Sequence, residues 1–131
     1  MKKFYVGIKG VIKDPNKGII LLLHKDYWDI PGGRIDGFEN FEQTLRRELN
    51  EELPGITVTK VGDLLGAYRL QKDIEENTSL VLLYYYVEAV LADPLQLSEV
   101  HYNYRLLTSV KDIPAGMNPA IDGILRRLLA S

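Results

Sequence analysis

The sequence predicts an α/β fold in which a mixed β-sheet lies between helices. Two observations lead to this prediction: several segments are rich in β-branched, aromatic and aliphatic residues, and two segments, one central and one at the C-terminal end, follow helical spacing. Strands covered by two helices form layers around a shared core. The chain has 131 residues, of which 46% are hydrophobic and 26% charged. Because that is the size and composition of one globular domain, we expect residues 1–131 to form a single domain.

The predicted strands begin near the N-terminus. Residues 4–12 are rich in aromatic and β-branched residues, and a turn cluster at residues 14–18 separates them from five aliphatic residues at 19–23. We expect the second segment to pair with the first and to be buried on both faces. Three further strands are predicted, at residues 56–70, 80–91 and 102–108.

Both predicted helices carry capping signals. The first covers residues 41–53, because Asn40 can cap it and Gln43 lies three residues further on, as in a capping box. The dipeptide at residues 54–55, Pro-Gly, ends this helix. The second helix begins at Asn118 and Pro119, and apolar residues then follow at helical spacing, at positions 121, 124, 125, 128 and 129.

The composition excludes several classes of protein. Lys and Arg total 16 against 18 for Asp and Glu, a net charge of -2, which argues against electrostatic binding of nucleic acid. The absence of cysteine excludes a disulfide framework and a thiolate site. The first apolar run is broken at Lys9, and the longest one contains Glu88, so we expect neither a signal peptide nor a membrane span. We therefore expect a cytoplasmic protein that binds neither nucleic acid nor membranes.

The first helix carries an unusual arrangement of glutamates. On a helical wheel, Glu48 and Glu51 flank the apolar arc, while Glu52 projects inside it; the arc consists of Phe41, Leu45, Leu49 and Leu53. A glutamate at a buried face needs a compensating charge, or it must be protonated. A hard divalent cation with oxygen ligands could supply that charge. Neighbouring arginines, as in a helix stabilised by internal salt bridges, could supply it too, and the helix alone does not decide between them.

The preceding loop favours a binding site. Gly32 and Gly33 can turn sharply and bring the backbone close to a ligand, and Arg34 can bind a phosphate. Five residues separate Gly33 from Glu39, and seven more separate Glu39 from the run Arg-Glu-Leu-Asn-Glu-Glu at residues 47–52. This spacing resembles the box of the Nudix hydrolases, in which a glycine and a glutamate precede the Arg-Glu-aliphatic-any-Glu-Glu run. The ending departs from the box by one extra residue before Gly55, after the last acidic position.

The resemblance to Nudix hydrolases implies a fold, a cation and a set of roles. It implies a Nudix-type α/β/α sandwich that cleaves a nucleoside diphosphate linked to a group X. Glu48, Glu51, Glu52 and the carbonyl of Gly32 would hold Mg²⁺ or Mn²⁺. Glu39 would pair with Arg47, beside Gly33, and support the site.

The resemblance leaves open two further roles, that of the general base and that of Tyr5. The general base would be Glu48 or Glu51 within the box, or a glutamate from a downstream loop, for which Glu99 is our candidate. Tyr5 could stack on a nucleobase or belong to the core.

The substrate is less constrained than the reaction class. The small size resembles that of the MutT-like members, which cleave nucleoside triphosphates to a monophosphate and pyrophosphate. Members that act on ADP-ribose often carry a proline some fifteen residues after the box, and no proline occurs between Pro54 and Pro94. We therefore expect a nucleoside triphosphate pyrophosphohydrolase with a small-molecule nucleotide substrate. The alternatives are a non-catalytic nucleotide sensor and a hydrolase of ADP-ribose or another nucleotide sugar; the sequence does not distinguish a monomer from a homodimer.

Overall fold

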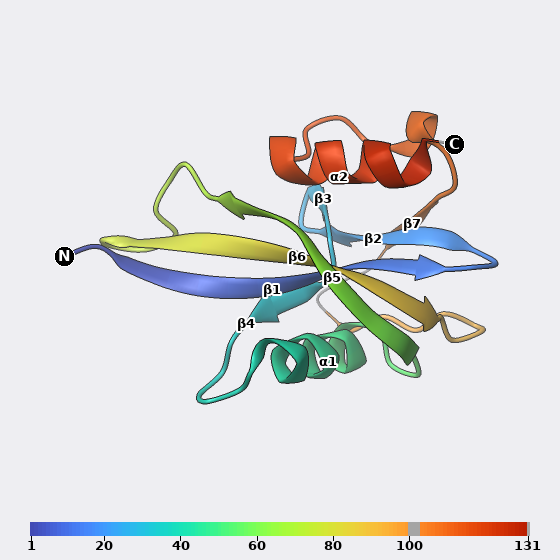
Figure 1. Cartoon of the computed structure of the whole chain (residues 1–131), viewed down its shortest axis with the longest axis horizontal. Helices are drawn as coiled ribbons and strands as arrows, with labels where there is room; N and C mark the ends of the chain where they lie inside the picture. The colour runs from blue at the N-terminus through green and yellow to red at the C-terminus, as the bar shows by residue number, and fades with distance from the viewer. Residues whose placement is uncertain (100–102, 131) are drawn as a thin grey trace.

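The computed structural model of the chain describes residues 1–99 and 103–130, and it arranges them in three layers. Helix α1 covers one face of a mixed sheet and helix α2 covers the other (Figure 1). The strands are β1 (Lys3–Asp14), β2 (Gly18–His24), β3 (Tyr27–Asp29), β4 (Gly32–Arg34), β5 (Thr57–Arg69), β6 (Thr78–Val90) and β7 (Tyr104–Leu107). The helices are α1 (Phe41–Glu52), the short 3-10 helix η1 (Val110–Asp112) and α2 (Pro119–Leu129). This arrangement confirms the predicted α/β/α sandwich.

The sheet has the order β3-β2-β1-β6-β5, while β4 pairs with β1 and β7 pairs with β2. Strands β1 and β6 run parallel from the pair Lys3 and Thr78 to the pair Lys13 and Glu88, and the other ladders are antiparallel. The long β1–β6 ladder forms the centre of the sheet, and its N-terminal end projects beyond the two helices (Figure 1). The sheet is therefore mixed, as the sequence predicts.

The strand predictions differ from the structure in two places. Strand β2 pairs with β1 at only two positions next to the turn, because β1 continues beside β4 and β6 while β2 pairs with β3 and β7. The short strands β3 and β4 were not predicted, since three residues are too few to show a period of two. The last predicted strand is present as β7, and its expected first residue, Tyr102, lies outside the described residues.

Both helices begin at the predicted caps. The Asn40 side chain accepts a hydrogen bond from the Gln43 N–H at 2.8 Å, and the Gln43 side chain accepts one from the Asn40 N–H at 2.9 Å. At α2, Asn118 accepts from the N–H of Ile121 at 3.0 Å, and Pro119 is the first helical residue. Among the described residues, no helix is long and apolar enough to cross a membrane.

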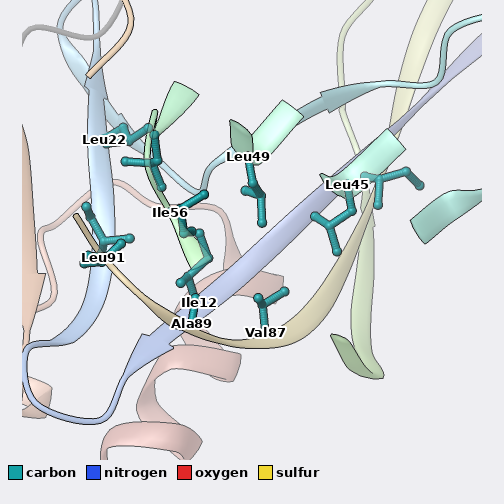
Figure 2. Packing of buried hydrophobic residues seen from close by; sticks show 11 residues of the cluster. Ile12, Leu22, Leu45, Leu49, Ile56, Val87, Ala89 and Leu91 are labelled. Carbon is teal, nitrogen blue, oxygen red and sulfur yellow. The ribbon is translucent and has the colours of Figure 1, made fainter. Parts of the chain in front are cut away.

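Helix α1 packs closely on the sheet through Leu45 and Leu49, which are buried against Ile12 and Val87 (Figure 2). Gly10 of β1 permits this approach, since a Cβ atom there would lie 3.1 Å from Leu45 Cδ1. Phe41 was expected in the same buried arc, but it is 45% exposed. It lies in the first turn and contacts Tyr85 only at a ring-centroid distance of 6.4 Å. The buried part of the arc therefore begins at Leu45, one turn into the helix.

A buried carboxylate ties the β1–β2 turn to the end of β6. Asp14 accepts a hydrogen bond from the N–H of Asn16 at 2.8 Å and from the N–H of Leu91 at 2.9 Å. Burial opposes the charged form, but backbone N–H groups of Leu91, Asn16 and Lys17 outweigh it, so the pKa of Asp14 is lowered. The charged Asp14 side chain therefore stabilises this corner of the sheet.

Replacing Asp14 by asparagine should lower the free energy of unfolding by about 2 kcal/mol at neutral pH, because one backbone donor then faces an amide NH₂ group. Because the folded pKa is depressed, this contribution is present above the unfolded pKa and is lost as the pH falls through the folded one. Urea denaturation of wild type and Asp14→Asn, from pH 7 downwards, measures both effects. Asp26→Asn is the control, since Asp26 is exposed and should change stability by less than about 0.5 kcal/mol. A stability difference that stays constant down to pH 2 would contradict the role of the charge.

Candidate active site

The two glycines of β4 leave room for different neighbours. Gly32 has a φ of +141°, and a side chain there would collide with the Ile8 carbonyl and lie 2.7 Å from Lys9 Cα. Gly33 instead has Glu48 next to it, and a Cβ atom at Gly33 would overlap the Glu48 carboxylate. The first glycine therefore lets β4 lie against β1, and the second lets a carboxylate of α1 reach the backbone of β4.

Glu52 is the buried carboxylate of the site. It is 8% exposed, and its Oε2 accepts a hydrogen bond from the Gly32 N–H at 2.7 Å. Burial is the main cause that raises the pKa of Glu52 to about 8, and the negative charges of Glu48 and Asp29 add to it. The positive charge of Lys9 and the Gly32 N–H act in the opposite direction. The sequence correctly predicts a glutamate within the buried face of the helix.

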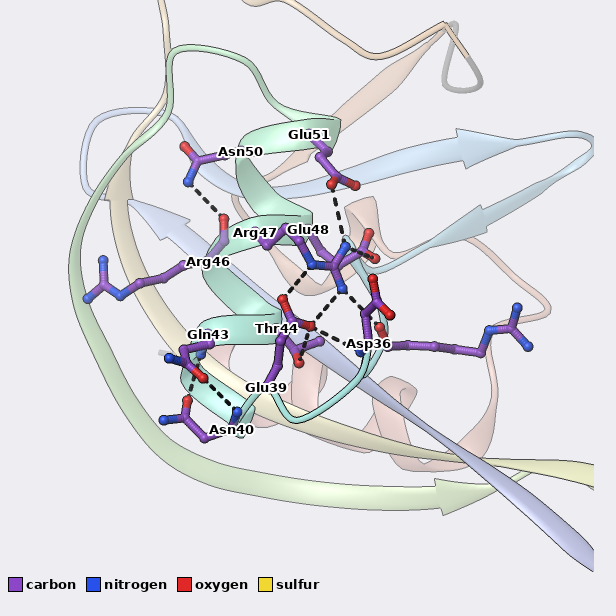
Figure 3. A network of polar contacts seen from close by, with 11 residues as sticks. Asp36, Glu39, Asn40, Gln43, Thr44, Arg46, Arg47, Glu48, Asn50 and Glu51 are labelled. Carbon is purple, nitrogen blue, oxygen red and sulfur yellow. Dashed lines mark hydrogen bonds and ion pairs between the residues drawn. The ribbon is translucent and has the colours of Figure 1, made fainter.

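Arg47 connects the loop to the helix. Its guanidinium donates to both carboxylate oxygens of Glu39, at 2.7 and 2.9 Å (Figure 3). It also donates to the carbonyl of Arg34 at 3.1 Å. The bonds from Arg47 to Glu39 lower the pKa of Glu39 to about 2, with help from the Asp36 N–H and the Thr44 hydroxyl. The ion pair between Glu39 and Arg47 that the resemblance implies is therefore present, and it is bidentate.

Arg47 also contacts the two flanking glutamates of α1. Its Nη1 atom lies 3.0 Å from Glu48 Oε1 and 3.4 Å from Glu51 Oε1 (Figure 3). The guanidinium thus acts as a cation shared by both carboxylates. Within residues 1–99 and 103–130, no three acidic or histidine side chains already converge as a metal cluster. The carboxylate oxygens of Glu48, Glu51 and Glu52 nevertheless match the donors that a hard divalent cation prefers, and they lie one helical turn or less apart.

Arg34 and Tyr5 lie next to these carboxylates. The Arg34 guanidinium carbon is 4.4 Å from the centre of the Tyr5 ring, and both residues line a surface pocket of about 370 Å³ together with Glu48. Tyr5 is 40% exposed, so the alternative expectation that it belongs to the core is wrong. It lies near the N-terminal end of β1, which projects beyond the helices (Figure 1).

Glu99 is exposed, and its loop is attached to the end of α1. The N–H of the preceding residue, Ser98, donates to the carbonyl of Glu52 at 3.1 Å. This bond brings the backbone of the loop close to the site. The adjoining residues 100–102 lie outside the described residues, and the role of Glu99 as general base stays a prediction.

Sequence reasoning missed one ion pair beside the site. Lys9 Nζ lies 3.2 Å from Asp29 Oδ2, and the Lys9 side chain is only 11% exposed. Lys9 lies opposite Gly32 in the β1–β4 ladder, which explains why its charge acts on Glu52. A lysine within a strand of buried aliphatic residues was the available signal, since lysine is seldom buried without a partner.

Replacing Glu39 by glutamine should lower the melting temperature, because an uncharged amide at this position cannot form the bidentate ion pair with Arg47. The depressed pKa of Glu39 means that its contribution is complete above about pH 5 and is lost as the pH falls from about 4.5 towards 2. Thermal unfolding between pH 7 and pH 2 measures the difference from wild type. Glu42→Gln removes a more exposed partner of Arg46 from the same helix and should have a smaller effect. Equal effects of the two variants at pH 7 would contradict the assigned role of Glu39.

Comparisons with known proteins agree with this geometry. The NUDIX domain family model matches residues 3–128. No curated protein matches the chain in sequence.

The fold is shared with solved structures of low sequence identity. The MutT protein from Methanosarcina mazei Go1 is 22% identical, with a TM-score of 0.77 over 96% of this chain and 93% of that chain. A MutT NUDIX hydrolase from Burkholderia pseudomallei is 23% identical, with a TM-score of 0.75 over 99% and 100%. An Ap4A hydrolase from C. elegans is 21% identical, with a TM-score of 0.73 over 95% and 94%. Because the family model covers nearly the whole sequence, the chain belongs to the NUDIX domain family.

Proposed function

We propose that this chain is a divalent-cation-dependent nucleoside triphosphate pyrophosphohydrolase, which releases a nucleoside monophosphate and pyrophosphate. Nudix hydrolases act on small-molecule nucleotides, and the proposal narrows that class to triphosphates. The main support is the position of two helix carboxylates, Glu48 and Glu52, next to the backbone of Gly33 and Gly32, with the loop fixed by the ion pair between Glu39 and Arg47. Such a site combines oxygen ligands for a cation with a rigid backbone beside them.

Glu48, Glu51 and Glu52, with the carbonyl of Gly32, are the proposed ligands of Mg²⁺ or Mn²⁺. When bound, such a cation would neutralise negative charge on the pyrophosphate oxygens and lower the pKa of a water molecule that it binds. Glu52 has the least freedom of the three carboxylates, because its Oε2 is bonded to the Gly32 N–H in a buried place. Glu51 is 59% exposed at its side chain and can adjust to the substrate.

Three carboxylates are candidates for the general base. Glu48 is mostly buried between Gly33 and Arg47, which favours a fixed orientation. Glu51 is exposed and has access to water. Glu99 lies in the loop whose backbone is bonded to the carbonyl of Glu52, so this loop can bring an additional carboxylate to the proposed cation site. We keep all three as candidates, with Glu99 as the one that comes from outside the box.

The choice of triphosphates rests on a feature that is absent from the sequence after the box. No proline follows the box before Pro94, unlike the pattern of many ADP-ribose hydrolases. The C. elegans Ap4A hydrolase shares the fold at 21% identity, and that likeness carries no substrate to this chain. A cytoplasmic location and the absence of a nucleic-acid partner remain expectations from the composition.

Replacing Glu52 by glutamine should reduce turnover of nucleoside triphosphates by at least about 100-fold, since the loss of a direct ligand should exceed the effect of an outer-shell change. Phosphate release, coupled through pyrophosphatase in the presence of Mg²⁺, measures turnover. The fold should persist, because the glutamine oxygen can still accept the Gly32 N–H.

Glu42→Gln is the matched control, because it removes one negative charge from the exposed side of the same helix. Mg²⁺ should raise the melting temperature of wild type and of Glu42→Gln more than that of Glu52→Gln, because only a ligand that binds the folded state stabilises it. Turnover of Glu52→Gln at the wild-type rate would overturn the proposed role of Glu52.

A further inference from the structure

Helix α1 covers only part of its face of the sheet. It packs over Ile12 and Val87, while the N-terminal end of the β1–β6 ladder projects beyond it (Figure 1). Phe4 lies eight residues before Ile12 in β1, so its side chain belongs to the same face. Leu64 of β5 lies opposite Tyr85 of β6, which packs at the edge of the α1 core. Phe4 and Leu64 are both half-exposed, so the uncovered part of this face is apolar.

Two further phenylalanines lie at the start of α1. Phe38 is fully exposed in the loop between β4 and α1, and Phe41 is half-exposed in the first turn of the helix. This loop and α1 lie on the same side of the sheet (Figure 1). Single exposed apolar residues are normal, but several on one side of a molecule mark an interaction surface. We call Phe4, Phe38, Phe41 and Leu64 the apolar face.

A pocket between α1 and β5 adjoins the apolar face. It measures about 220 Å³, which is large enough for one aromatic side chain. Its lining is mostly apolar and consists of Phe41, Glu42, Leu45, Val61, Gly62 and Tyr85. Phe41 belongs both to this pocket and to the apolar face. One side of the molecule therefore carries a projecting aromatic side chain, Phe38, and a pocket that an aromatic side chain can fill.

The charges beside the apolar face have partners within the chain. Glu42 Oε2 lies 3.0 Å from Arg46 Nε, so the carboxylate that lines the pocket is balanced. At the other end of the face, the Arg69 guanidinium lies 5.0 Å from the ring centre of Phe4. The net charge of the whole chain is only -2. A second copy of the chain therefore meets little like-charge repulsion at this face, and a strongly charged partner finds no complementary patch around the pocket.

We propose that the apolar face is the interface of a homodimer, in which Phe38 of each copy enters the pocket between α1 and β5 of the other. An interface with two-fold symmetry must be complementary to itself, and this face combines the projecting side chain with the pocket that fits it. Both features lie at the start of α1. Two exchanged contacts can therefore form across one symmetry axis and close the assembly at two copies.

The exposed area is close to what a stable dimer needs. An aromatic side chain has about 150–250 Å² of surface, so the four side chains of the apolar face expose roughly 500 Å² per copy. Two copies would bury roughly 1,000 Å² from these side chains alone, against about 1,200 Å² for the smallest stable interfaces. The half-buried residues Val6, Val61 and Leu83 on the same face supply more. The dimer would also bury Phe41, which the apolar arc of α1 predicts as a buried residue.

The interface would share a loop with the proposed cation site. Phe38 directly precedes Glu39, whose carboxylate forms the bidentate ion pair with Arg47. A partner that holds Phe38 would restrain this loop from the side opposite Arg47. Dimer formation does not depend on which nucleotide the chain cleaves, so its test is independent of the proposed function.

Sedimentation velocity across micromolar concentrations of the full chain measures the association. Wild type should sediment as a dimer of two 14.9 kDa chains. Phe38→Ala should raise the dissociation constant at least about tenfold, since a central aromatic anchor carries much of the binding energy of an interface. Tyr27→Ala is the matched control, because Tyr27 is a half-exposed aromatic residue on β3, at the opposite edge of the sheet from β5. It should match wild type.

A photocrosslink locates the partner of Phe38. Replacing Phe38 by p-benzoylphenylalanine keeps an aromatic group there, and light links it to neighbouring C–H bonds. Mixing ¹⁵N-labelled with unlabelled protein distinguishes links between copies from links within one copy. Mass spectrometry should find the links between copies in α1 or in β5, in the peptides that contain Leu45 or Val61.

Three results would overturn the homodimer. The first is a wild type that stays monomeric at all concentrations, which would leave the apolar face to a different partner. The second is an equal change of the dissociation constant in Phe38→Ala and Tyr27→Ala. The third is a dimer whose crosslinks from position 38 lie outside α1 and β5. Circular dichroism checks that the variants fold, and Leu64→Ser, also on the apolar face, replaces Phe38→Ala if that variant does not fold.

Discussion

The bidentate ion pair between Arg47 and Glu39 is the contact on which the rest of the site depends. It joins the loop after β4 to the middle of α1, and the same guanidinium also reaches the Arg34 carbonyl and the carboxylates of Glu48 and Glu51. A planar group with five donors can make these contacts together, whereas a lysine could not. Arg47 therefore fixes Glu39, Glu48 and Glu51 relative to the loop backbone.

The sheet supplies the second constraint. Leu45 and Leu49 anchor α1 on β1 and β6, and Gly10 allows the close approach that brings Glu52 within reach of the Gly32 N–H. Burying a carboxylate is costly, and the raised pKa of Glu52 expresses that cost. A bound cation would offset the cost of burying the charge of Glu52. The packing of the core therefore also positions a carboxylate that can bind the proposed cation.

Much of this arrangement could be predicted from the sequence, because its signals are local. The capping box of Asn40 and Gln43, the glutamate within the apolar arc and the spacing from Gly33 to Glu52 all lie within one short stretch. Strand β4 could not be predicted in this way, since Gly-Gly-Arg has no strand preference and pairs only because β1 lies beside it. The pair of Lys9 and Asp29 and the exposure of Phe41 also depend on contacts between distant segments, which no local pattern reports.

The most direct measurement of the central claim is identification of the products that wild type forms from nucleoside triphosphates with and without Mg²⁺. Phosphorus NMR of the reaction distinguishes the two bonds that water can cleave. A cation-dependent pyrophosphohydrolase site predicts a nucleoside monophosphate and pyrophosphate, formed only with the cation. Formation of a nucleoside diphosphate and phosphate, or turnover that is unaffected by removal of Mg²⁺ with a chelator, would contradict the account.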